Sequence, residues 1–172
     1  GGGIIETQQQ IHRITPLLRW RSHEREQMLA SAHHFLTRTT FTEVIFPKVS
    51  RELQPLYNAV RSFDRLQQLV VKGPTSYQLQ VPTTPRYFIS ANKQPVHRTS
   101  FKTLYFKSEE NLNRAYIVLN SSYMYWWWRV HDGGMTISER TLLDLPIPRF
   151  DPVLAQQFVK KLEQSERTSK VV

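Results

Sequence analysis

The chain has 172 residues, a length typical of one domain, and 40% of them are hydrophobic, which is enough to build a core. The absence of cysteine excludes disulfides and cysteine-ligated zinc or iron–sulfur sites. No apolar run approaches the ~18 residues of a membrane span, and the start has no basic segment followed by an apolar one. We therefore expect a cytoplasmic protein without membrane contact. Because residue 1 is Gly rather than Met, we also expect a fragment of a longer chain.

The chain is basic, with a net charge of +9 from 23 Lys and Arg against 14 Asp and Glu. The distribution is uneven: the segment 65–108 contains no acidic residue but carries Arg65, Lys72, Arg86, Lys93, Arg98, Lys102 and Lys107. A long segment of one sign creates a field that attracts polyanions, so nucleic acid is a candidate partner. The alternative is an uninvolved solvated surface, because a high isoelectric point alone does not distinguish nucleic-acid binders.

The sequence of the first 70 residues predicts one strand with a helix before it and a helix after it. Thr15-Pro16 is a helix-start signal, and a helix is predicted from there to about Arg38, although the polar run 21–27 favours a break or an exposed turn. The aromatic and β-branched run 41–46 predicts a strand. Ser50 is suited to cap a second helix, which either starts at Gln54 or is kinked by Pro55.

The segment 72–107 predicts a small antiparallel sheet with long loops. Prolines and a Gly-Pro pair separate three short runs, SYQLQV, RYFIS and SFKTLYF, two of which partly alternate polar with apolar residues. Because this segment coincides with the acid-free stretch, we expect a basic sheet whose protruding loops can approach a phosphate backbone.

Helices dominate the remainder. One is predicted over 109–129, with Trp126 on its apolar stripe and Trp127 and Trp128 pointing elsewhere. For these indoles a core or interface role is favoured over base stacking. A turn at 132–134 and a short helix capped by Ser138 follow, the Pro-rich run 145–148 ends that helix, and a last helix begins at Asp151-Pro152.

Together these elements predict an α+β fold in which a small, mostly antiparallel sheet is flanked by helices. We expect three parts: a helical region at 1–70, a core at 71–165, and a frayed tail at 166–172.

The sequence contains no recognisable catalytic motif. An amine-modifying methyltransferase needs an acid-or-amide–Pro–Pro–aromatic loop, and the chain has no Pro-Pro pair. The common metal-dependent nucleases need Glu-x-Lys or Asp-x-Lys, which is also absent. The six histidines lack metal-ligand spacing, so surface or packing roles are favoured for them. We expect no catalytic, cofactor-binding or metal-binding residue in this chain.

Four features follow one another in the stretch 111–148: Leu119-Asn120-Ser121, the aromatic run 123–128, Gly133-Gly134, and Leu145-Pro146-Ile147-Pro148. Their order resembles the C-terminal specificity region of Taq-type adenine-specific DNA methyltransferases and of the fused restriction-modification enzymes related to them. Upstream, 85–88 and 103–106 look like the two strands that precede this helix in the family. The match covers about residues 85–165.

The resemblance implies a target-recognition domain for double-stranded DNA that forms one lobe of a bilobal clamp and does no chemistry of its own. The missing catalytic lobe, in the same or a partner chain, would hold S-adenosylmethionine and flip the target adenine, and the helical region 1–70 would link to it. In a fused enzyme the parent protein would also have endonuclease activity. The implied location is the cytoplasm of a bacterium or an archaeon.

Two groups of residues are candidates for DNA contact. The first should lie on or beside one concave basic surface: Arg86, Lys93, His97, Arg98 and Lys102. The second flanks the structural turn Gly133-Gly134, where we expect positive φ and a close approach to phosphate: Arg129, His131, Ser138 and Arg140. A simple helix cap is the alternative for the glycines. For the whole chain the alternatives are a protein-interaction or scaffolding domain with a basic surface and an RNA-binding domain.

Overall fold

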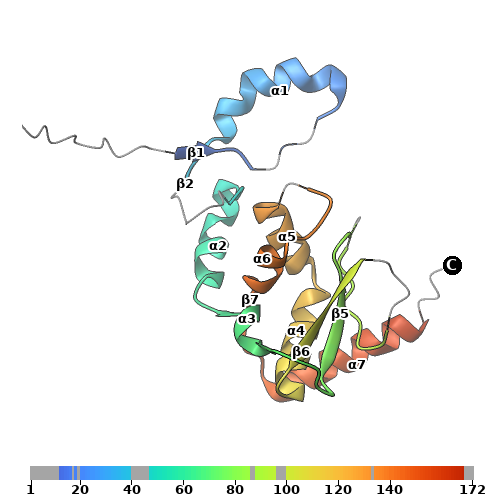
Figure 1. Ribbon diagram of the computed structural model, residues 1–172. Coiled ribbons are helices and arrows are strands. Elements are labelled where there is room, and N and C mark those ends of the chain that lie inside the picture. Colours follow the sequence, from blue (N-terminus) through green and yellow to red (C-terminus); the bar gives the residue numbers. More distant parts are fainter. Residues whose placement is uncertain are drawn as a thin grey trace, which may run out of the picture. The chain divides into compact units, whose positions relative to one another are not determined.

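The computed structural model describes residues 12–16, 18, 20–39, 47–85, 88–95, 100–132 and 134–168 (Figure 1). The chain divides into two compact units, Gly1–Pro55 and Leu56–Val172. The division falls before the expected boundary at residue 70, because α3 (Leu66–Leu69) buries both of its leucines and contacts α4 in the second unit. The strand predicted at 41–46 lies outside the described residues.

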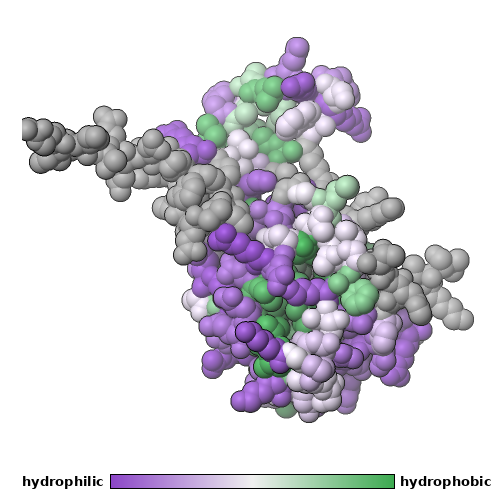
Figure 2. All heavy atoms as spheres, in the orientation of Figure 1, coloured by the Kyte–Doolittle hydropathy of each residue, from purple (hydrophilic) through white to green (hydrophobic). Residues whose placement is uncertain are grey.

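The first unit consists of short elements: β1 (His12–Ile14), η1 (Ser22–Glu24), α1 (Arg25–Ser31), η2 (Ala32–Phe35), β2 (Thr37–Thr39) and η3 (Arg51–Leu53). Strands β1 and β2 pair antiparallel. The prediction of a helix starting at Thr15 is wrong, because the helical run begins within the polar stretch 21–27. There the Arg21 N–H donates to Glu24 Oε2 at 2.8 Å and caps the first turn. Several large hydrophobic side chains of this unit are exposed, namely Trp20, Leu29, Phe35 and Leu53, and Figure 2 shows hydrophobic surface over α1.

Helix α2 (Gln54–Val60) crosses the boundary between the units and starts at Gln54, one of the two predicted alternatives. Pro55 is therefore in its first turn, where a missing backbone N–H costs no helical hydrogen bond. Tyr57 and Val60 are the buried residues of this helix.

The second unit contains a three-stranded antiparallel sheet, in the order β4-β6-β5. Its strands are β4 (Val70–Val71), β5 (Gln78–Pro82) and β6 (Phe101–Phe106). Gln78 pairs with Tyr105 and Pro82 with Phe101, so the alternating apolar residues of β5 and β6 share one face. That face is buried and contributes Leu79, Val81, Leu104 and Phe106 to the core. The predicted α+β fold and its small antiparallel sheet are confirmed.

The described part of the run 86–90 does not form the strand that was predicted for it. Residues 88–90 lie outside strands, residues 86 and 87 lie outside the described part, and Gln80 instead forms an isolated bridge with Asn92. The expected equivalence of 85–88 to a family strand is therefore wrong for Pro85 and Phe88. The second expected strand, 103–106, lies within β6.

The predicted helix 109–129 is two helices, α4 (Glu109–Leu119) and α5 (Ser122–His131). The break falls at Asn120, whose side chain binds both backbone groups of Ala91: Oδ1 accepts from Ala91 N at 3.0 Å, and Nδ2 donates to Ala91 O at 3.1 Å. Asn120 Nδ2 also donates to Tyr116 O at 2.9 Å. This side chain therefore ends α4 and ties it to the segment that follows β5.

The break resets the helical phase, which makes the prediction for the tryptophans wrong. Trp127 and Trp128 are 1% and 2% exposed, whereas Trp126 is only half-buried. The indole N–H of Trp127 donates to Thr141 O at 3.1 Å. The core role that was favoured over base stacking is confirmed for Trp127 and Trp128.

The remaining elements are α6 (Glu139–Leu143), β7 (Pro146–Ile147) and α7 (Pro152–Thr168). Helix α7 starts where predicted, because Asp151 Oδ1 accepts from the N–H groups of Val153 and Leu154 at 3.0 Å each. It packs on α4, the helix that also contacts β5 and β6 (Figure 1). Helices from both sides of the sequence thus flank the sheet.

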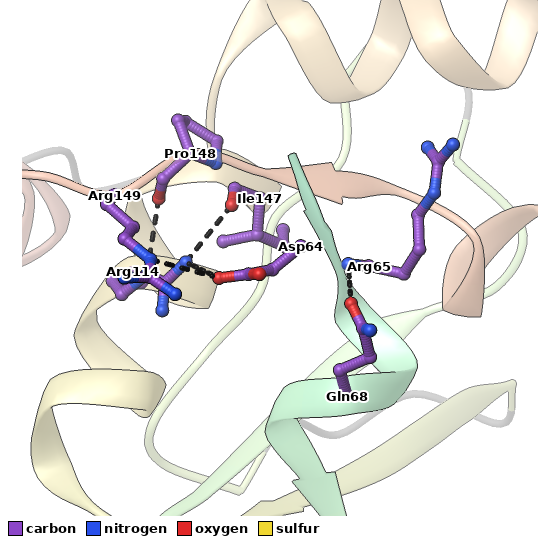
Figure 3. A network of polar contacts seen from close by, with 7 residues as sticks. All are labelled: Asp64, Arg65, Gln68, Arg114, Ile147, Pro148 and Arg149. Atoms are coloured by element: carbon purple, nitrogen blue, oxygen red, sulfur yellow. Dashed lines mark hydrogen bonds and ion pairs between the residues drawn. The ribbon is translucent and has the colours of Figure 1, made fainter. Parts of the chain in front are cut away.

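The Pro-rich exit is held in place by a buried arginine. Strand β7 pairs with β3 (Asp64–Arg65), and Arg114 of α4 reaches both strands (Figure 3). Its guanidinium donates to Ile147 O at 3.1 Å, Pro148 O at 3.2 Å and Asp64 Oδ2 at 2.9 Å. This contact fixes the path of the chain between α6 and α7.

Candidate nucleic-acid interface

Two loops meet at the end of the sheet where β5 ends and β6 begins. The first, residues 83–100, is closed at its base: Thr83 N donates to Ser100 O at 3.2 Å, and the two hydroxyls lie 2.5 Å apart. The second, residues 132–138, joins α5 to α6. Ile137 N donates to Thr83 O at 2.7 Å and so ties the second loop to the first. We call the described residues of these two segments, 83–85, 88–95 and 100 in the first and 132 and 134–138 in the second, the sheet-end loops.

The 132–138 loop is closed by its own side chains. The carboxylate of Asp132 accepts from Ser138 N at 3.0 Å and from the Ser138 hydroxyl at 3.2 Å. The Ser138 hydroxyl also accepts from Thr141 N at 3.2 Å, so Ser138 caps α6 as predicted. The N-terminus of α6 was expected to bind a phosphate. The Asp132 carboxylate already lies beside Ser138 there and takes the position of an anion.

The expectation of positive φ at the Gly133-Gly134 turn is wrong for Gly134, which does not have a positive φ. Among the described glycines, Gly73 has that conformation. A Cβ at Gly134 would meet nothing closer than Thr136 N at 3.9 Å, which is ordinary contact. Neither the backbone nor the packing of this chain therefore requires glycine at 134. Gly133 lies outside the described residues.

Two candidates at the end of α5 are engaged within the protein. The guanidinium of Arg129 lies 5.1 Å from the Trp128 ring and donates to Gly134 O at 3.5 Å, which places it beside the 132–138 loop. His131 lies between the Trp127 carbonyl, 3.0 Å from Nδ1, and the Tyr57 hydroxyl, 3.1 Å from Nε2. Burial lowers the pKa of His131, so the ring is neutral at pH 7 and its role here is in packing.

Two lysines of the first candidate group are described, and each has an acidic partner on a different helix. Lys93 Nζ lies 2.8 Å from Glu163 of α7 and 5.0 Å from the ring centre of Tyr116. Lys102 forms an ion pair with Glu139 of α6, immediately after the 132–138 loop. The structure thus brings Lys102 to the sheet-end loops and engages Lys93 with α4 and α7. Arg86, His97 and Arg98 lie outside the described residues.

Acidic residues from later in the chain partly neutralise the acid-free segment. Arg65 lies 3.6 Å from Asp144, and Lys93 and Lys102 are paired as above. Lys72 and Lys107, which follow β4 and β6, are exposed. The sequence does not reveal this pairing, because each acidic partner lies far beyond the segment, in or directly after α6 or in α7. Ser138 and Arg140 are exposed at the start of α6.

Sequence analysis missed three features of this region: Asp132, Met135 and the contact between Thr83 and Ile137. Asp132 closes the 132–138 loop, and Met135 at its tip is 85% exposed. An apolar residue within a polar turn was a usable signal for Met135. No local signal connects Thr83 to Ile137, since a backbone hydrogen bond between two loops does not depend on residue type.

Within the described parts of the chain, no three His, Cys, Asp or Glu side chains are grouped so as to hold a metal ion. No described helix combines the length and the apolar character that crossing a bilayer requires. Comparisons with protein-family models, with curated proteins and with solved structures gave no match.

Proposed function

We propose that this chain recognises double-stranded DNA as the specificity domain of an adenine-specific DNA methyltransferase or restriction-modification enzyme, and that the sheet-end loops face the DNA. The observation that carries the proposal is the 2.7 Å hydrogen bond from Ile137 N to Thr83 O. It joins two segments that the sequence indicated independently, one by its charge and one by its family-like turn. Recognition domains place variable loops on a rigid scaffold in this way.

The charge of the region supports a polyanionic partner. Glu139 and Lys102 neutralise each other in their ion pair, and the Asp132 carboxylate, although still charged, is turned into the loop by its hydrogen bonds from Ser138. Arg129 donates to Gly134 O of the same loop, Arg140 is the second residue of α6, and the whole chain carries a net charge of +9. Arginine is suited to both phosphate and guanine contacts. The catalytic lobe, its S-adenosylmethionine and any endonuclease activity would belong to the parent protein and rest on the sequence resemblance at 111–148 alone.

The proposal is tested by fluorescence anisotropy with a labelled DNA duplex of mixed sequence, titrated at several salt concentrations. We expect the logarithm of the binding constant to fall linearly with the logarithm of salt, by about 0.9 for each phosphate contacted. Tighter binding of an RNA of the same sequence would favour the RNA-binding alternative. Absence of nucleic-acid binding at low salt would contradict the proposal and favour the protein-interaction alternative.

A pair of variants locates the surface. Lys102→Ala should weaken binding to all duplexes alike and reduce the salt slope by about 0.9. Glu139→Ala removes a negative charge and releases Lys102 from its ion pair, so it should tighten binding. Lys160→Ala, which removes an exposed lysine of α7, controls for net charge and should have a smaller effect than Lys102→Ala. If Lys102→Ala and Glu139→Ala weaken binding equally, the ion pair is structural and the DNA surface lies elsewhere.

A further inference from the structure

Met135 has the most exposed large hydrophobic side chain in the described part of the chain, at 85%. It lies at the tip of the 132–138 loop, between Gly134 and Thr136, both of which are also exposed. A methionine side chain is apolar, unbranched and polarisable, so it can fit an irregular apolar gap and contact aromatic faces. Water offers it neither kind of contact.

The backbone that carries Met135 is held on both sides. Arg129 donates to Gly134 O at 3.5 Å on one side, and the Trp128 indole N–H donates to Thr136 O at 3.3 Å on the other. Next to Thr136, Ile137 is 3% exposed and makes the 2.7 Å bond to Thr83 O. An exposed apolar side chain on a fixed loop can be inserted into a partner without the entropy cost of ordering the loop.

Gly134 adds a second observation. Because neither its φ nor its surroundings require glycine, a side chain at 134 would cost the fold little. The bare backbone instead leaves room beside Met135, which a partner's backbone approaching the tip would need. The guanidinium of Arg129, which donates to Gly134 O, adds a positive charge beside this tip and so favours a partner of negative charge.

We propose that Met135 is an apolar wedge that inserts between neighbouring base pairs of duplex DNA, with the DNA backbone passing over Gly134. This inference rests on the proposed DNA-binding function and names the residue that deforms the duplex. Partial unstacking by an apolar side chain bends the duplex and brings more phosphate within reach of the surrounding cations. Sequence preference then follows in part from how easily each base step unstacks.

The test uses the full chain with a short DNA duplex that carries a donor and an acceptor dye at its two ends, together with 2-aminopurine at pyrimidine–purine steps. Wild-type protein should raise both energy transfer and 2-aminopurine fluorescence on binding. Met135→Ala should bind about tenfold more weakly, the equivalent of losing one buried apolar contact, and should leave both signals at their free-DNA values when the duplex is saturated. Met135→Leu should restore both signals, because leucine is also an effective wedge.

Two controls make the outcome decisive. Val153→Ala removes an apolar side chain of α7 that is 64% exposed and should change neither affinity nor the two signals. Gly134→Ala should keep the melting temperature of the wild type and weaken DNA binding. If Met135→Ala binds and bends the duplex as the wild type does, the wedge is refuted while the proposed function stands. If the wild type binds no duplex at any salt concentration, the proposed function fails, and the wedge fails with it.

Discussion

Replacing Arg114 by Met should be among the most destabilising single changes in the second unit. Arg114 is 7% exposed and donates to Asp64 and to the carbonyls of Ile147 and Pro148 (Figure 3). Methionine fills a similar volume but leaves both carbonyls without this donor. Each carbonyl bond to a charged donor contributes about 1.5 kcal/mol, since such bonds lie in the range of about 1.5–3. The Asp64 carboxylate remains in this variant, is 33% exposed and can be hydrated. Loss of its ion pair with Arg114 therefore adds only roughly 0.5–1 kcal/mol.

The expected loss is therefore about 3.5–4 kcal/mol, which lowers the melting temperature by roughly 10–20 °C for a unit of this size. Circular dichroism during urea and thermal unfolding measures it. Arg149→Ala is the matched control, because Arg149 approaches the same Asp64 oxygen at 3.4 Å but its side chain is 83% exposed. It should cost at most about 0.5 kcal/mol. Equal stability of Arg114→Met and wild type, or equal losses in the two variants, would refute this account of the network.

The network also predicts a pH dependence. The hydrogen bond from Arg114 lowers the pKa of Asp64, with a smaller contribution from Arg149. The stabilisation is therefore complete above the unfolded pKa of about 3.9 and is lost as the pH falls through the lower folded pKa. The free energy of unfolding can be measured by urea titration from about pH 5 to about pH 2, a range that extends one to two units on either side of that pKa. In Asp64→Asn its decrease with falling pH should be smaller than in the wild type. An unchanged acid profile would show that the ion pair contributes little.

Three further predictions concern the site and its support. Burial lowers the pKa of His131, so the free energy of unfolding should fall as the pH drops below about 6.5, and His131→Gln should remove that part of the dependence in urea titrations. Asn120→Ala should destabilise the second unit by about 2–3 kcal/mol, because both backbone groups of Ala91 lose a partner, and a loss under about 0.5 kcal/mol would contradict this. Arg140→Ala should leave the melting temperature nearly unchanged and weaken DNA binding, and the reverse pattern would make Arg140 structural.

Local patterns in the sequence were sufficient for several elements. Alternation predicted β5 and β6, the Asp151-Pro152 pair predicted the start of α7, and Ser138 was correctly assigned as a cap. These signals are reliable because they depend on close neighbours. A capping side chain binds within about one helical turn, and strand alternation depends on adjacent residues and one strand pair. Where a single side chain reset a local pattern, prediction failed. Asn120 ends α4 and binds Ala91. As a result, the burial of Trp126, Trp127 and Trp128 differs from the burial predicted for one continuous helix.

The candidate site depended on the tertiary structure to a greater extent. Composition indicated a basic segment, and the order of motifs indicated a family-like turn, but neither showed that the two segments touch. Their contact is a backbone hydrogen bond between Thr83 and Ile137, and the pairing of Lys102 with Glu139 joins the same two regions. Arg114 and Asp64 likewise meet although they lie 50 positions apart. The sequence by itself determined where the charge is concentrated and those elements whose signal is local, such as β5, β6 and the start of α7, because both depend on residue type and short-range order. The tertiary structure decided which charges are neutralised and which loops meet, because those depend on partners that the folded chain brings together from distant positions.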